Sequence, residues 1–271
     1  LHFNLAKSAF LTELLEKIAW QVRDTGYDFT TIPVLYDEQY EKIPLVEIEG
    51  WDAIRMNLEF DPNAAVHDYY EVIGTSEKTR FITFDDWAGD RMITHILDTL
   101  ERYNVKATFF IRAAGAENNP NLVRAIAEAG HDVACHTYSH EASYVFLDAK
   151  SMQEDAIRCY QVLTEAIGRQ PTLFFRFPRH EVSKTAINAI LATGYTSIVQ
   201  GAIRPPDYEC SKDCVIRTIY KDEKNYYRNG EVLILHILDN ATGGAALPQI
   251  IEHYRARGYK LSKVSDFIPA H

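Results

Sequence analysis

The chain lacks a basic charge excess and a long hydrophobic run, and each absence argues against a class of function. Its 28 lysines and arginines stand against 38 acidic residues, for a net charge of −10. Proteins that bind a nucleic-acid backbone or an anionic membrane surface need a basic patch, which this composition disfavours. No apolar run approaches the roughly 18 residues of a membrane span. We therefore expect no nucleic-acid partner and no membrane insertion in this chain, whereas neutral sugar polymers stay open as partners.

Cysteines are few, and they do not decide the compartment. Cys135 and Cys159 fall on a predicted strand and a predicted helix, where a small buried thiol is expected. Cys210 and Cys214 are close enough in sequence to close a short loop as a disulfide, and the sequence leaves open whether they do. The first residues lack the pattern of a signal peptide, as would a secreted protein after removal of its leader.

The rest of the composition is that of a globular protein. With 271 residues, 46% of them hydrophobic and 12% aromatic, the chain is long enough for one large core, or a core plus a small appendage. Apolar residues spaced by three and four predict an amphipathic helix from about Ser8 to Arg23. Further on, alternation over Ile54–Phe60 and an apolar run over Ile43–Ile48 are typical of strands. We therefore predict that residues 1–76 form a small α+β N-terminal extension.

From residue 77 onward, strand-like and helix-like segments alternate. Helical spacing predicts helices between most of the strands, the third of them opened by a capping box at Ser151 and Glu154. This alternation indicates an α/β fold with a parallel sheet covered by helices, and seven strands fit a closed or distorted barrel. The predicted strands are Phe81–Phe84, Ala107–Ile111, Asp132–Cys135, Leu173–Phe177, Thr196–Val199, Val232–Leu235 and Lys260–Val264.

Two of these strands stop at side chains that handle metals or protons. Phe81–Phe84 stops at the adjacent carboxylates Asp85 and Asp86. Neighbours on a continuing strand point to opposite faces, so both can serve one site only if the strand ends there. His136 and His140 follow another strand and offer two nitrogen ligands on one side of a turn. One Asp and two His leave a coordination position open for water, which is a catalytic arrangement.

These stretches resemble a known family. Thr83-Phe84-Asp85-Asp86, followed by His136-Thr137-x-x-His140, is similar to the first two motifs of the polysaccharide deacetylases, carbohydrate esterase family four, also called the NodB-homology domain. The resemblance implies a distorted (β/α)7 barrel formed by residues 77–271, the catalytic domain. It also implies Asp86, His136 and His140 as ligands of one divalent ion, expected to be zinc with cobalt or nickel as alternatives, and Asp85 as the general base.

The third motif of the family, Arg-x-Pro-aromatic-Gly, resembles Arg176-Phe177-Pro178-Arg179-His180. It implies that Arg176 holds the base carboxylate in place and that the backbone N–H of Arg179 is an oxyanion donor. Arg179 and His180 depart from the motif, and we expect His180 to contact substrate.

The fifth and fourth motifs resemble segments farther along the chain. His236 matches the Leu-x-His histidine that protonates the leaving amine, with Leu235 expected beside it in the substrate pocket. Asp207 and Tyr208 stand for an Asp-Trp pair, with Asp207 tuning the acid and Tyr208 contacting substrate. Gly201 and Arg204 depart from the fourth motif, where a tryptophan and an aspartate are common.

Two further residues, Trp87 and His131, are not assigned to the catalytic machinery. Trp87 stands where the family usually has glycine, and it either stacks on a sugar ring or belongs to the core. His131 is expected to be a strand-entry residue and not a ligand.

The resemblance implies a metal-dependent hydrolase that removes acetyl groups from an N-acetylated or O-acetylated glycan, such as peptidoglycan or chitin oligomers. Alternatives are an amide or cyclic-imide hydrolase acting on a small molecule, and an idle carbohydrate-binding module. An acetylated glycan is the expected partner, no protein partner is predicted, and the protein is expected outside the cell or at its surface, with the cytoplasm left open. The departures predict a wider, more positive pocket in which Arg179 binds a substrate carboxylate, or else pairs with Glu181 or Asp207. Neither the polymer, the metal nor the oligomeric state follows from the sequence.

Overall fold

The computed structural model describes residues 9–26, 43–225 and 228–270. The chain divides into two compact units, residues 1–42 and 43–271. In the first unit the described element is helix α1, Ala9–Asp24, which agrees with the predicted helix except for Ser8, a residue outside the described ranges. Within the described residues, no helix is both long and apolar enough to cross a membrane.

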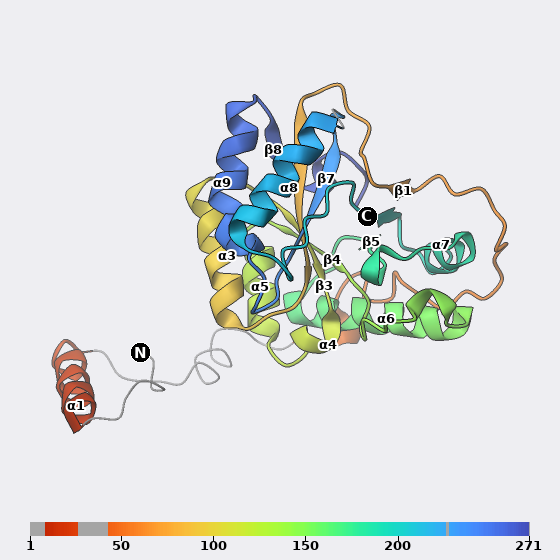
Figure 1. The fold of residues 1–271 in the computed structure, drawn as a ribbon. Coiled ribbons are helices and arrows are strands. Elements are labelled where there is room, and N and C mark those ends of the chain that lie inside the picture. The colour runs from red at the N-terminus through yellow and green to blue at the C-terminus, as the bar shows by residue number, and fades with distance from the viewer. Residues whose placement is uncertain (1–8, 27–42, 226–227, 271) are drawn as a thin grey trace. The chain divides into compact units, whose positions relative to one another are not determined.

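The second unit is built on a parallel sheet, in which strands far apart in the sequence lie side by side (Figure 1). The order is β1-β6-β5-β4-β3-β2-β7, and β8 also pairs with β2. All seven predicted strands are present, and the structure adds the short strand β1, which pairs with β6. The strands are β1 Tyr69–Tyr70, β2 Thr79–Asp86, β3 Thr108–Ile111, β4 Asp132–Cys135, β5 Phe174–Phe175, β6 Ser197–Val199, β7 Glu231–His236 and β8 Lys260–Ser262.

The sheet curls into a distorted barrel whose seam is not a regular ladder. Isolated bridges join β7 to the chain that follows β1, between Val72 and Glu231, and to the chain that follows β6, between Ile203 and Leu233. Gly230 sits at this seam: its carbonyl accepts the N–H of Ile73, and its own N–H donates to the carbonyl of Thr79. The predicted α/β barrel is therefore confirmed, with closure that depends on a few contacts.

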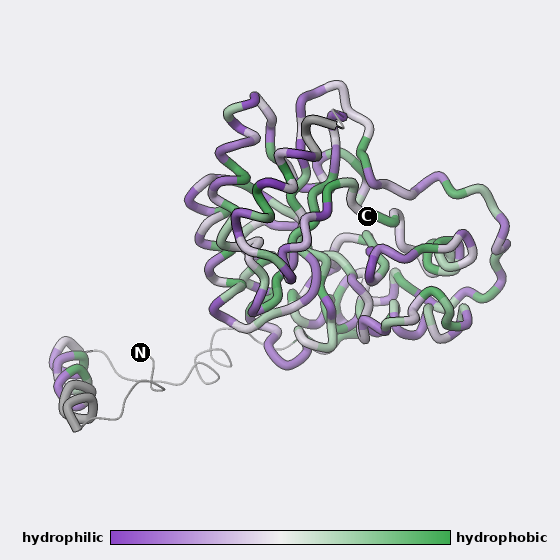
Figure 2. Tube along the Cα trace, viewed as in Figure 1, coloured by the Kyte–Doolittle hydropathy of each residue, from purple (hydrophilic) through white to green (hydrophobic). Residues whose placement is uncertain are grey.

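Helices cover the outside of the sheet. They are α3 Asp90–Arg102, α4 Ala113–Ala116, α5 Pro120–Glu128, α6 Ala149–Ile167, α7 Lys184–Leu191, α8 Lys212–Asn225 and α9 Gly243–Ala256, with short 3-10 turns at Leu45–Glu47, Tyr144–Phe146, Pro178–His180 and Val264–Asp266. The main core fills the space between helices and sheet, and a smaller cluster, which includes Phe81, Phe110 and Val232, fills the barrel. Green, hydrophobic stretches accordingly run through the middle of this unit in Figure 2.

The start of α6 differs from the prediction. The predicted capping box was Ser151 with Glu154, but the N-cap is Asp148, whose side chain accepts the N–H of Ser151. The box was wrong because Asp148 offers its carboxylate one turn earlier, at the favoured N-cap position. Gly168 ends the helix in the left-handed conformation.

Residues 43–76 cluster with the second compact unit, whereas the sequence predicts a catalytic domain that starts at residue 77. The strands predicted at Ile43–Ile48 and Ile54–Phe60 are wrong. The first segment holds a 3-10 turn. The second segment does not pair with a strand, and it lies against α6 and the end of α7. At Asn57 the side chain of Gln153 takes the place of a neighbouring strand, because it bonds both the backbone N–H and the carbonyl of Asn57.

Candidate active site

The chemically active side chains lie at one end of the barrel. Asp85 and Asp86 end β2, His136 follows β4, Arg176 follows β5, and His236 ends β7. Because parallel strands all end at the same edge, these side chains meet there. They lie at or beneath a pocket of about 650 Å³ that Asp85, Asp86, His136, His140 and His236 help to line.

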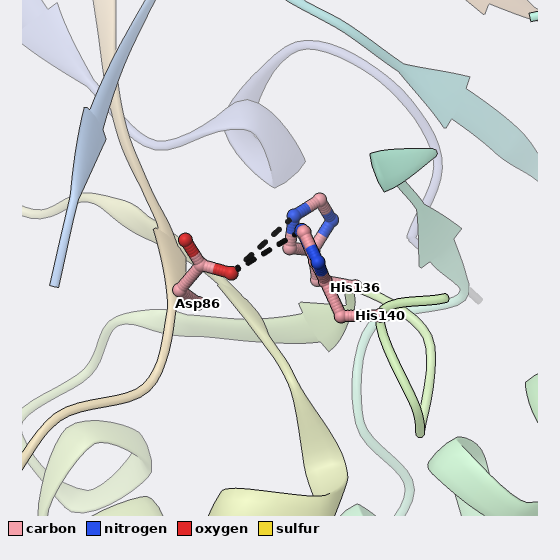
Figure 3. Close-up of side chains that lie close together, drawn as sticks. All are labelled: Asp86, His136 and His140. Carbon is pink, nitrogen blue, oxygen red and sulfur yellow. Dashed lines mark ion pairs between the residues drawn. The ribbon is translucent and has the colours of Figure 1, made fainter. Parts of the chain in front are cut away.

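Asp86, His136 and His140 form a compact donor cluster (Figure 3). One oxygen or nitrogen atom from each lies within 4.8 Å of the others. The Nε2 atoms of His140 and His136 are 3.4 Å and 4.0 Å from Oδ1 of Asp86. Two imidazole nitrogens and one carboxylate oxygen suit a divalent transition metal, and three protein ligands leave a coordination position open.

The backbone bends to bring these donors together. Asp86, Thr137 and His140 have φ angles of 79°, 64° and 55°. These values lie in the left-handed region of backbone conformation, which residues other than glycine rarely occupy. At Asp86 the change of conformation ends the strict alternation of β2, so both carboxylates reach one pocket. The described chain has six non-glycine residues with positive φ. Five of them lie in the motifs of the site, because Arg179 and His180 of the third motif join the three residues named above.

Hydrogen bonds behind the cluster orient the histidines. Nδ1 of His136 lies 2.9 Å from the carbonyl of Arg176, so a donating Nδ1–H leaves the Nε2 lone pair facing the cluster. The loop between the histidines is held by Asp155 of α6, which accepts the N–H groups of Tyr138 and Ser139. Burial, and then the neighbouring His136, lower the pKa of His140, which favours the neutral imidazole that binds metals. No sequence pattern had singled out Asp155.

Asp85 is held by Arg176 instead of joining the donor cluster. Both side chains are buried, and Nη1 of Arg176 lies 2.5 Å from Oδ1 of Asp85. The guanidinium also donates to Thr83 and to the carbonyl of Val199. Burial alone would raise the pKa of Asp85, but the charge of Arg176, followed by those of His136 and His236, lowers it overall. The carboxylate is therefore kept ionised.

His236 and Asp207 form a second pair across the pocket. Asp207 is fully buried, and its two oxygens meet Nδ1 of His236 at 2.7 Å and the backbone N–H of His236 at 2.8 Å. Burial lowers the pKa of His236, but the hydrogen bond to Asp207 and the charges of Asp85 and Asp207 outweigh it, so the pKa is raised. The ring of Tyr208 packs edge-on against the imidazole, with centroids 4.9 Å apart, and Tyr208 lines the pocket.

Two predicted substrate residues lie elsewhere. Trp87 is 9% exposed and belongs to the core, where its ring closely packs against Gly115. Leu235 is fully buried in the core between sheet and helices. Alternation along β7 explains the error, because Ile234 shares the face of His236 and lines the pocket in its place.

The departures in the third and fourth motifs shape one wall of the pocket, which includes Arg179, His180 and Arg204. No ion pair of Arg179 with Glu181 or Asp207 is present among the described residues, and its side chain is exposed. His180 instead bonds Glu71, with Nε2 and Oε1 3.0 Å apart. Gly201 does not widen the pocket as predicted, because a Cβ there would lie 2.5 Å from the Ile234 side chain, which already fills that space.

His131 and the four cysteines lie outside the donor cluster and have structural roles. His131 lies directly before β4, at the strand-entry position that was expected. Its Nδ1 accepts the N–H of Ala107, and burial lowers its pKa to about 4, so the imidazole is neutral. Cys210 and Cys214 form a disulfide, whereas Cys135 and Cys159 are buried free thiols. The carbonyls of Cys210 and Asp207 both accept the hydroxyl of Thr242, which ties the disulfide loop to the segment that carries Asp207.

Comparison with known proteins yields one family. The family model described as polysaccharide deacetylase matches residues 73–198. A peptidoglycan-N-acetylglucosamine deacetylase of Bacillus cereus is 26% identical over 261 residues, covering 91% of each chain. Among solved structures, the Bc1960 peptidoglycan N-acetylglucosamine deacetylase has a TM-score of 0.68 at 26% identity, over 75% of this chain and 94% of that one.

A second solved structure shares the fold alone. The Bacillus anthracis protein BA3943, a pseudoenzyme of carbohydrate esterase family four, has a TM-score of 0.66 at 16% identity, over 73% of this chain and 68% of that one. The matching family model, the full-length relative and the site geometry agree with one another. The chain therefore belongs to the polysaccharide deacetylases, the hydrolases of carbohydrate esterase family four.

Proposed function

We propose that the protein is a metal-dependent deacetylase of N-acetylated amino sugars in peptidoglycan-type glycans, acting outside the cell or at its surface. The observation that carries this proposal is the pair of oppositely tuned groups beside the donor cluster. Arg176 favours the ionised form of Asp85, and Asp207 favours the protonated form of His236. A base and an acid with pKa values pushed apart are what amide hydrolysis needs.

Asp86, His136 and His140 would hold the ion, for which zinc is the expected choice and cobalt or nickel are alternatives. The donor set fits such an ion because the histidine Nε2 atoms face Asp86 and the Nδ1 of His136 is engaged from behind. When bound, the ion supplies a Lewis acid that polarises the acetyl carbonyl and acidifies a water molecule.

Asp85 acts as the base in this proposal. One of its oxygens is engaged by Arg176, and Oδ2 lies 3.8 Å from Nε2 of His136, next to the place of the ion. From there it accepts the proton of the attacking water. His236 then donates a proton to the amine that leaves, and the raised pKa of His236 favours the protonated imidazole that this step needs. The backbone N–H of Arg179 is proposed to donate to the developing oxyanion.

The preference for peptidoglycan rests on charge. Arg179 and Arg204 both line the pocket, and their side chains are exposed. Arginine binds carboxylates through paired hydrogen bonds, and the lactyl group of muramic acid or the stem peptide carries one. The relatives described above, whose names state that they act on peptidoglycan N-acetylglucosamine, lend support to this substrate class.

Acetate release from peptidoglycan fragments, chitin oligomers and small amides tests the proposal, with zinc, cobalt or nickel returned to metal-stripped protein. We expect metal-dependent release, fastest on the carboxylate-bearing fragments. Arg179→Ala should remove that preference, whereas Arg217→Ala on α8 is a matched control that leaves it intact. Ammonia release from a cyclic imide or amide, without acetate from any glycan, would favour the small-molecule alternative. No turnover of any substrate, with the metal bound, would favour an idle binding protein.

A further inference from the structure

Two glutamines among the described residues are completely buried, and their amides have opposite surroundings. Gln153 on α6 uses both ends of its carboxamide: Oε1 accepts from Asn57, while Nε2 donates to the carbonyls of Asn57 and Ala189. Gln200 follows directly after β6 and is likewise 0% exposed. Neither Oε1 nor Nε2 of Gln200 has a hydrogen-bond partner among the described residues.

The orphan amide of Gln200 lies at the active site. Gln200 lines the same pocket as Asp85, His140 and His236. A buried polar group without a partner costs stability, so such groups are uncommon in folded proteins unless they have a function. The amide of Gln200 is thus unpaired at the place where a substrate would bring partners.

The main chain of Gln200 is fixed on both sides. Its N–H donates to the carbonyl of Tyr70 at 2.7 Å, and its carbonyl accepts from Nη2 of Arg176 at 3.3 Å. Arg176 is the residue that holds Asp85, so the main chain of Gln200 and the proposed base are anchored on one guanidinium. Recognition residues need this kind of rigid support.

We propose that Gln200 is a specificity residue whose carboxamide binds hydroxyl groups of the substrate sugar. A carboxamide both donates and accepts, and neighbouring sugar hydroxyls supply both partners at once. A carboxylate would satisfy only the donor end, so Gln200 complements the arginines of the pocket instead of duplicating them. This inference rests on the proposed function and names a further contact for the same substrate.

The test compares Gln200→Met with Gln153→Met, because methionine keeps the length of the side chain and removes the amide. Calorimetry measures binding of an N-acetylglucosamine tetramer and of acetohydroxamate, a metal-binding probe without sugar hydroxyls. We expect Gln200→Met to weaken tetramer binding by about 10- to 100-fold, about tenfold for each lost hydrogen bond. Acetohydroxamate binding should stay unchanged. Gln153→Met should leave both affinities unchanged.

Thermal unfolding gives an opposite pair of results. Gln200→Met removes an unpaired buried amide, so Tm should stay level or rise by about 2 to 4 °C, whereas Gln153→Met loses three hydrogen bonds and should melt several degrees lower.

A tetramer affinity within threefold of the parent overturns the inference, as does equal weakening of both ligands or a lowered Tm in Gln200→Met. Absence of deacetylation by the parent would count against the proposed function, and the binding measurements still decide the role of Gln200.

Discussion

Single residues at this site are held in charge states that they would not keep alone. Asp85 and Arg176 are both buried, where an isolated charge is costly. Each side chain compensates the charge of the other, with Nη1 of Arg176 2.5 Å from Oδ1 of Asp85. The pair therefore links the chemistry of the site to the stability of the fold, and removal of one partner should reveal that link.

Replacing Arg176 by Met should lower the free energy of unfolding of the metal-free protein by about 3 to 5 kcal/mol at neutral pH, because the Asp85 charge stays buried without its partner. Arg176 lowers the pKa of Asp85 below its ordinary value of 3.8. The stability from the pair is thus complete above that value and is lost as pH falls through the lower folded pKa. Urea unfolding of parent and variant at pH 7 and near pH 3 measures the loss, which should shrink at the lower pH.

The control is Arg55→Met, which removes a pair with Asp52 whose side chains are 69% and 44% exposed. Exposed pairs contribute less than about 1 kcal/mol. A similar loss in both variants, or a loss in Arg176→Met that does not change with pH, would contradict the role given to the buried pair.

The second residue-scale prediction concerns His236. Asp207 raises its pKa, so the protonated form persists to higher pH, and activity should fall on the alkaline side as that proton is lost. Asp207→Asn removes the charge and should move this alkaline limb to lower pH, with at least about tenfold lower activity on the alkaline side. The profile of kcat/KM against pH measures the change. Glu209→Gln, with the same charge change on the same loop, should leave the limb in place; movement in both would show a general field effect.

The motif residues of the site were predictable from sequence because their chemistry and strand-end positions are local features. Gln200 was not, since nothing in the sequence tells which buried amide lacks partners. Ile234 was within reach, because alternation places it on the face of His236, yet the prediction named Leu235. Trp87 was left open between pocket and core, and only the packing against Gly115 places it in the core.

At the scale of elements, the barrel depends on its weakest seam. An isolated bridge at Val72 and the hydrogen bond from Ile73 to Gly230 connect β7 to the chain before β2, and a second bridge at Ile203 connects β7 to the chain after β6. Gly230 has a φ angle of 81°, and a Cβ there would lie 1.7 Å from the carbonyl oxygen of Ile73. No side chain fits without a shift of backbone at the place where the barrel closes.

Gly230→Ala should therefore destabilise the protein by about 3 kcal/mol or more, through steric conflict added to left-handed strain. Gly168→Ala is the matched control, because Gly168 has a φ of 68° but nothing within 4 Å of its Cβ position. It should cost only about 1 to 2 kcal/mol. Chemical denaturation measures both, and equal losses would mean that the seam yields easily.

The strands were predictable because buried parallel strands are short continuous apolar runs with clear ends. β1 was missed because two residues carry no pattern, and pairing with β6 alone defines them. The alternation at Ile54–Phe60 was misread because Met56 and Leu58 are exposed and the segment is held by Gln153 instead of a neighbouring strand. Helix α8 was not predicted, since its charged residues dilute the apolar spacing.

At the scale of the molecule, the compact second unit begins well before the first catalytic motif. Ile54 and Ile73 are 2% and 1% exposed and belong to its core clusters. The short strand β1 lies at one end of its sheet order. We therefore propose that residues 43–76 are part of the catalytic unit.

A chain that starts at Ile43 should keep the Tm of the full chain within about 2 °C. A chain that starts at Glu77 should lose about 3 to 6 kcal/mol from Ile54 and Ile73 alone, which corresponds to a Tm lower by roughly 10 °C or more. Differential scanning calorimetry of the three chains measures this. Equal Tm values for the two shortened chains would instead support a domain boundary at residue 76.

The left-handed residues of the site have a consequence for protein engineering. Asp86, Thr137, His140, Arg179 and His180 hold conformations that glycine adopts without strain. A laboratory selection for thermal stability alone would therefore favour substitutions to glycine at these positions. Such a selection would enrich stable proteins that have lost the side chains of the site. A selection for a more stable variant must therefore also measure turnover in the same round.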